Sequence, residues 1–149
     1  MAEMSPELMD LINSVPLSYL ATASGDGVPD VAPVATALAV DSGTVVVAVT
    51  GQGKSASNIR KNPRAALVVH SSLPAGTRAS LHSISRVLGA QLKGRATILT
   101  SGEAHEQARR RTAEVLGAEA RDAFGATVVL TVEEVFSLVP GSAEVSRAH

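Results

Sequence analysis

A glycine-rich turn followed by a lysine and a serine is the stretch of this sequence best suited to binding an anion. Residues 48–63 read AVTGQGKSASNIRKNP, and a short helix is predicted over residues 54–61 because a proline follows it. The start of a helix offers unpaired backbone N–H groups and a partial positive charge. Lys54 adds a full charge, and the hydroxyls of Thr50 and Ser55 add donors. The turn therefore predicts a clamp for a phosphate group.

Two other interpretations of this turn compete with the clamp. A nucleotide-hydrolysing loop reads Gly-x-x-x-x-Gly-Lys-Ser/Thr, but Ala48 stands where its first glycine belongs. That loop also needs parallel strands, whereas the strands on either side are predicted to be antiparallel. Alternatively, Ser55 only caps the helix and Lys54 is only a solvated lysine. Asn58 would then be a residue of the helix surface.

The remaining reactive side chains give no catalytic constellation, so the catalytic group stays unknown. The chain has no cysteine, which excludes thiol catalysis and cysteine-bound metals. The four histidines have no metal-ligand spacing, so no metal site is predicted. Glu133 and Glu134 are interpreted as a polar pair on a strand. The histidines are His70, His82, His105 and His149.

Composition limits the kind of protein that this sequence can encode. The 149 residues suit a single domain, residues 1–149, with 45% hydrophobic and only 2% aromatic residues. A net charge of −1 and the scarcity of aromatic rings argue against nucleic-acid binding. No apolar run approaches the ~18 residues of a membrane span, and the N-terminus lacks a basic signal segment. We expect a cytoplasmic protein with no membrane association.

The elements that must position the anion site are mostly strands. Short turns between them predict an antiparallel, mainly β fold, a β-barrel closed on itself with helices at its ends. In the helix predicted over 103–116, the residues expected to face inward are Ala104, Ala108, Val115 and Leu116. A long loop is predicted over 71–88. The predicted strands are 17–23, 29–40, 44–49, 65–70, 89–99 and 128–138, and helices besides 54–61 are expected from Pro6 to before Pro16 and over 103–116.

Three stretches in this order resemble a known family. YLATASGDGVPDVAPV is followed by VVVAVTGQGKSASNIRKNPRAALVV and then by GAQLKGRATI. Together they resemble the pyridoxamine 5′-phosphate oxidase-like, FMN-binding split β-barrel family over roughly residues 8–138. The resemblance implies a six-stranded antiparallel split barrel. It also implies a homodimer with cofactor sites at the subunit interface.

The resemblance carries cofactor-binding roles to specific positions. Lys54 and Ser55 match phosphate-binding positions, and Asn58 is expected to support the phosphate turn. Thr50 and Gly51 match a strand end that lies against the flavin. Lys93 and Arg95 are expected to line the cleft. The segment beside the flavin ring comprises Pro33, Val34, Ala35 and Thr36.

The expected function is that of an FMN-binding flavoprotein, an oxidoreductase that moves hydride or electrons between a small-molecule substrate and the flavin. The alternatives are a non-catalytic flavin-binding or electron-carrier module, or a relative that uses deazaflavin F420 or haem. The basic pattern expected for binding pyridoxamine phosphate as substrate is not recognisable. The dimer has a physical motive as well, because a small barrel poor in aromatic residues cannot enclose a flavin alone.

Overall fold

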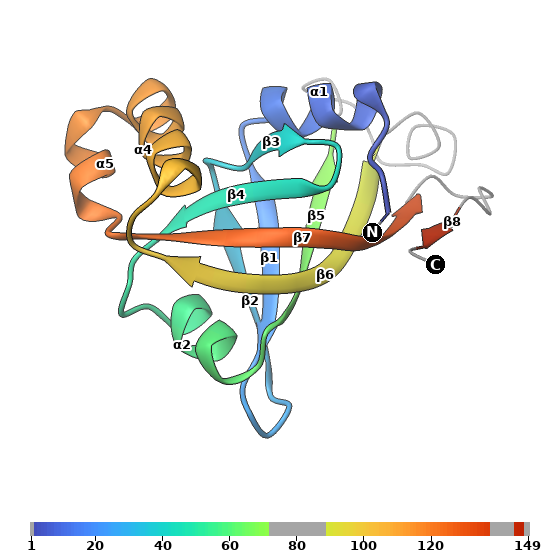
Figure 1. Cartoon of the computed structure of the whole chain (residues 1–149), viewed down its shortest axis with the longest axis horizontal. Coiled ribbons are helices and arrows are strands. Elements are labelled where there is room, and N and C mark those ends of the chain that lie inside the picture. The colour runs from blue at the N-terminus through green and yellow to red at the C-terminus, as the bar shows by residue number, and fades with distance from the viewer. Residues whose placement is uncertain (1, 72–88, 138–144, 148–149) are drawn as a thin grey trace, which may run out of the picture.

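One curved antiparallel sheet forms the body of the protein, and helices cover its ends and one side (Figure 1). The computed structural model describes residues 2–71, 89–137 and 145–147. The predicted loop therefore lies outside the described residues apart from Ser71, as do His82 and His149. The elements are α1 (Pro6–Ser14), β1 (Ser18–Ala23), β2 (Pro29–Val34), β3 (Leu38–Asp41), β4 (Thr44–Val49), α2 (Lys54–Lys61), β5 (Arg64–His70), β6 (Gly89–Leu99), α4 (Glu103–Leu116), α5 (Ala118–Ala123), β7 (Ala126–Ser137) and β8 (Val145–Arg147).

The strand order confirms the predicted mainly β split barrel but not its closure. The order is β2-β1-β5-β6-β7-β4-β3, and β8 pairs with β7 beyond the end of β4. No pairing joins β2 to β3 within the described part of the chain, so the sheet is open there. The prediction of a barrel closed by strand pairing was wrong.

The single strand predicted over 29–40 is in fact two strands, which raises the strand count above the six expected. The chain bends between β2 and β3, and the Thr36 hydroxyl there accepts a hydrogen bond of 3.1 Å from the Ala48 N–H of β4. A side chain thus replaces the ladder partner at this point. Because the bond joins residues far apart in sequence, no local pattern could reveal it.

The helices form where capping and stop signals predicted them. The Ser5 hydroxyl accepts from the Leu8 N–H at 3.2 Å, and Pro6 opens α1. α1 packs on β3 and β5, and α2 packs on β1 and β6. α4 packs on β4 and β7, and it continues into α5 through Gly117, whose φ of 95° breaks the helix. Sequence reasoning missed α5.

The buried face of α4 differs from the predicted one. Val115 and Leu116 were expected inside, but they are 39% and 45% exposed. The buried positions are His105, Ala108 and Thr112, which follow one helical face at spacings of three and four residues.

The core is a layer of aliphatic side chains that alternate along the strands. Leu20, Leu67 and Leu92 are fully buried and lie opposite one another across β1, β5 and β6. Residues 45–49 of β4 are all buried, which confirms that this strand is apolar on both faces.

A β-bulge in β7 requires a glycine in the neighbouring strand. Lys93 pairs with Glu134 and Gly94 pairs with Val132, so Glu133 is the extra residue of the bulge. A Cβ on Gly94 would overlap the backbone carbonyl of Thr131.

We therefore expect Gly94→Ala to lower the free energy of unfolding by about 1–3 kcal/mol, the usual cost of overpacking. The matched control is Gly125→Ala, because a Cβ there meets nothing within 4 Å. Urea unfolding of both variants measures the difference, and equal stabilities would contradict this explanation of the bulge.

Candidate functional site

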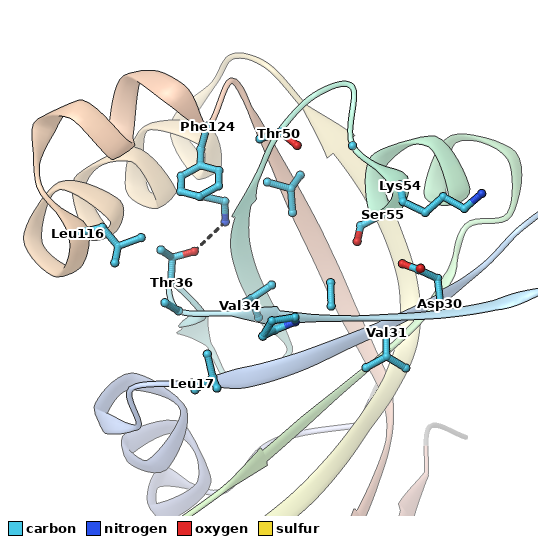
Figure 2. A pocket seen from close by; sticks show the side chains of 16 residues that line it. Leu17, Asp30, Val31, Val34, Thr36, Thr50, Lys54, Ser55, Leu116 and Phe124 are labelled. Atoms are coloured by element: carbon cyan, nitrogen blue, oxygen red, sulfur yellow. Dashed lines mark hydrogen bonds between the residues drawn. The ribbon is translucent and has the colours of Figure 1, made fainter.

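A pocket of about 540 Å³ opens between β2, the end of β4, the start of α2 and the α4–α5 pair (Figure 2). It brings together most of the residues predicted to bind a cofactor, although they come from segments far apart in the sequence. Gly51 and Asn58 are not among its lining residues. The predicted residues that line it are Pro33, Val34, Ala35, Thr36, Thr50, Lys54 and Ser55.

Strand β2 supplies one wall of the pocket by alternation of its side chains. Figure 2 shows Asp30 on the cavity side of the strand and Val31 on the other side. Asp30, Ala32 and Val34 share the cavity side; Asp30 and Ala32 are half-buried, and Val34, next to the bend, is buried. Val31 is 64% exposed and belongs to the outer rim.

The turn before α2 presents bare backbone donors to the pocket. The Gly53 N–H donates to the Thr50 carbonyl at 3.1 Å, and Gly53 caps the helix without any side-chain hydrogen bond. The N–H groups of Lys54, Ser55 and Ala56 have no partner among the described residues. The interpretation of Ser55 as a mere helix cap is therefore wrong, since Gly53 holds that position.

Gly51 contributes to the turn through its carbonyl, which accepts a hydrogen bond of 2.6 Å from Nη1 of Arg60. This bond ties the turn to the last part of α2. Arg60 had not been singled out from the sequence, because only the folded helix brings it back to the turn.

The two neighbours at the start of α2 point in different directions. Figure 2 shows the Ser55 hydroxyl directed toward the cavity and the Lys54 side chain extending away from the apolar wall. Ser55 is buried, whereas Lys54 is exposed. The positive charge of Lys54 therefore lies at the rim of the pocket.

The positive charge of Lys54 acts on a carboxylate, Asp26, in the turn between β1 and β2. The pKa of Asp26 is held below its ordinary value, mainly because the Ser24 hydroxyl donates to its carboxylate, and then by the Asp26 backbone N–H. Lys54 and Lys61 lower this pKa further by attraction. Asp26 itself does not line the pocket, so this carboxylate lies near Lys54 but outside the pocket lining.

Asn58 fixes α2 to the sheet and does not reach the pocket. It is only 3% exposed, and its Nδ2 donates to the Thr22 hydroxyl of β1 at 3.0 Å. Its expected support of the phosphate turn is indirect, through the position of the whole helix.

Thr22→Val is expected to lower the free energy of unfolding by about 1–3 kcal/mol, because it leaves the buried Asn58 amide without its partner. A double-mutant cycle with Asn58→Ala, followed by urea unfolding, isolates the pair. A coupling energy near zero would show that the bond does not hold α2.

The apolar end of the pocket comes from residues that sequence reasoning missed. Leu116 and Phe124 lie at the end opposite Lys54 and Ser55 in Figure 2, and Leu17 closes the lower side. Leu116 had been placed in the core, and Phe124 reaches the pocket only because α5 turns the chain back. Asp30 could have been identified from the sequence, because it lies four residues before Val34 and residues at even spacing share one face of a strand.

Lys93 and Arg95 do not line this pocket, so that expectation was wrong. The inner side of β6 is taken by Leu92, Gly94 and Ala96, which leaves both basic residues exposed on the outer face. Lys93 Nζ lies 5.1 Å from the centre of the Phe136 ring.

The described histidines also lie elsewhere. The His70 ring stacks parallel to Tyr19 at 6.3 Å between centres, and Nδ1 of the buried His105 hydrogen bonds with the Thr127 hydroxyl at 2.8 Å. Within residues 2–71 and 89–137, no group of three potential metal ligands occurs. The described helices are also too short or too polar to cross a membrane.

Comparison with known proteins adds an independent line of evidence. A family model described as pyridoxamine 5′-phosphate oxidase matches residues 4–138. No curated protein matches the sequence. The structure is similar to that of HupZ from Group A Streptococcus, with a TM-score of 0.71 and 25% identity over 98% of this chain and 99% of that one.

Two further solved structures share the fold at lower identity. An FMN-binding protein from Syntrophomonas wolfei has a TM-score of 0.69 and 13% identity, over 89% of this chain and 86% of that one. The haem storage protein HutZ from Vibrio cholerae has a TM-score of 0.68 and 16% identity, over 91% and 94%.

Proposed function

The chain belongs to the pyridoxamine 5′-phosphate oxidase family, and from this premise we propose that it is a flavoprotein that binds FMN in the pocket between β2, β4 and α2. The observation that carries the proposal is the row of unpaired N–H groups at the start of α2, which opens onto an apolar pocket. Such a helix start favours a phosphate. A volume of about 540 Å³ also falls within the range of cofactor sites.

Different residues of the pocket would hold different parts of FMN. The N–H groups of residues 54–56 and the Ser55 hydroxyl would hold the phosphate, while Lys54 adds attraction from the rim. Val34, Val49 and Phe124 would cover the ring system and exclude water from it. A Cβ on Gly53 would lie 2.5 Å from the Thr50 hydroxyl, so a larger residue there would require the Thr50 side chain to move.

When bound, FMN would supply hydride or electron transfer, and the protein would supply placement and an apolar surrounding. We infer an oxidoreductase that acts on a small molecule. The alternative is a flavin-binding electron carrier without a substrate of its own. Turnover of reduced nicotinamide with an electron acceptor distinguishes the two, because a carrier without a substrate site would show no saturable turnover.

Haem is the second candidate, since one structural neighbour is a haem storage protein and another is a haem-binding protein. Haem iron needs an axial ligand such as His, Cys, Met or Tyr. Among the described residues that line the pocket, none is of these types, and His70 and His105 lie outside it. The described lining thus offers an anion clamp and an apolar surface, which suit a flavin phosphate. Deazaflavin F420 would use the same phosphate clamp.

A second copy of the chain would complete the pocket. Leu17, Val31 and Leu116 are large apolar residues exposed at its rim. Covering them with a partner would remove apolar surface from water and shield the ring. We expect a dimer by light scattering, and a monomer with full cofactor occupancy would contradict this part of the proposal.

The identity of the cofactor is tested by the ligand that the purified protein carries. After denaturation, the released compound is measured by absorbance and by mass. The proposal predicts the mass and the yellow spectrum of FMN. A Soret band in the native spectrum would establish haem instead, and the mass of F420 would establish the deazaflavin.

A further inference from the structure

We propose that Asp30 determines the ligand specificity of this pocket by accepting hydrogen bonds from a hydroxyl-bearing chain that joins the ring system of the ligand to its phosphate. The proposal rests on the flavin site described above. Asp30 lines the pocket together with Lys54 and Ser55, and Figure 2 shows its carboxylate on the cavity side, facing α2. Its chemistry differs from every other residue of the pocket, which contains no second carboxylate among its described lining residues.

The position of Asp30 along β2 places it at the α2 end of the pocket, away from the apolar end. Val34 is buried near the apolar end, and Asp30 lies four residues earlier on the same side of the strand, about 13 Å away at the usual rise. The unpaired N–H groups of α2 lie at the same end of the pocket as Asp30. A ligand with its ring near Val34 and its phosphate at α2 would bring the part of its connecting chain next to the phosphate close to Asp30.

The carboxylate of Asp30 has an unused capacity to accept hydrogen bonds. The side chain is half-buried, and within the described residues it makes no hydrogen bond or ion pair. An ionised carboxylate can only accept, so hydroxyl groups are suitable neutral partners. Bonds to a charged acceptor are also stronger than those between neutral groups.

The charge of Asp30 argues against a pocket built for a bare phosphate. A carboxylate beside a phosphate repels it, and Lys54 offsets only part of that cost from the exposed rim. Hydroxyl groups between the Asp30 carboxylate and the phosphate would donate hydrogen bonds to the carboxylate. Asp30 would then favour binding of the ligand instead of opposing it. The polar end is therefore matched to a polyol phosphate, the chemical class of the FMN side chain.

Binding of two phosphate-free flavins tests the role of Asp30 separately from the phosphate clamp. Riboflavin carries the hydroxylated chain and lumiflavin does not. In fluorescence titrations of the ligand-free protein, Asp30→Ala is expected to weaken riboflavin binding about tenfold and to change lumiflavin binding less than twofold. Asp30→Asn keeps one acceptor oxygen and should lose only about threefold. Asp26→Ala removes a carboxylate from the nearby turn, outside the pocket lining, and should change neither.

The outcomes separate this inference from the proposed function. If the wild-type protein binds FMN but Asp30→Ala keeps its riboflavin affinity, or loses both flavins equally, the role of Asp30 is wrong and the flavin site stands. An unchanged riboflavin affinity together with tighter FMN binding would show that Asp30 only repels phosphate. If the wild-type protein binds no flavin, the proposed function fails, and this inference fails with it.

Discussion

Ser55→Asp is expected to weaken FMN binding by about 2–4 kcal/mol, or roughly 30- to 900-fold, because it places a negative charge where the phosphate would bind. Ser55 is buried at the start of α2, and its hydroxyl points into the pocket (Figure 2). An aspartate there would compete with the phosphate for the same N–H groups. Equilibrium titration of the ligand-free variant with FMN measures the loss.

The variant is expected to fold, which makes the result informative. An acidic residue in the first turn of a helix is favourable with respect to the helix dipole. Ser55→Ala is the matched control, since it removes one hydroxyl without adding charge and should cost only about 0.5–1.5 kcal/mol of FMN affinity. If Ser55→Asp binds FMN as tightly as Ser55→Ala, the phosphate does not bind at this helix.

Leu67→Ala is expected to lower the free energy of unfolding by about 2–5 kcal/mol. Leu67 is fully buried between Leu20 and Leu92, and the surrounding core is built mainly from valine, alanine and leucine. Branched and short side chains held in a sheet cannot move far enough to fill the cavity. Urea unfolding with an unchanged m-value would identify a pure loss of stability.

The neighbouring residue provides the control for that measurement. Val68 lies on the opposite, half-buried face of β5, so Val68→Ala deletes apolar surface outside the core. We expect this change to cost less than about 1.5 kcal/mol. Equal losses for Leu67→Ala and Val68→Ala would contradict the assignment of the core face.

Local signals predicted much of the fold. The bounds of α2, β4 and α4 match the predicted ones, because Asn62-Pro63, the turn at 41–43 and the glycines around α4 act on neighbouring residues. The break between β2 and β3 escaped prediction because it depends on the bond from Ala48 to Thr36. The open side of the sheet depends on strand pairing over the whole chain, which turn residues do not encode.

Some parts of the candidate site could also be predicted from the sequence, and others could not. The turn at 50–55 could be predicted from its own residues because it is a single short segment, and the segment at 33–36 was predicted from the family resemblance. Leu17 and Phe124 could not, since separate elements bring them to the pocket. For Lys93 and Arg95 the alternation of β6 was visible, but the sequence did not indicate which face of the strand would meet the site.

The most direct test of the central claim is a titration of the ligand-free protein with FMN and with riboflavin under identical, low-salt conditions. The claim is that α2 holds the phosphate of a flavin whose ring lies against β2. We predict that FMN binds at least about tenfold more tightly than riboflavin, the scale of a charged hydrogen bond, and that Ser55→Asp removes the difference. Equal affinities of the wild-type protein for the two flavins would contradict the claim.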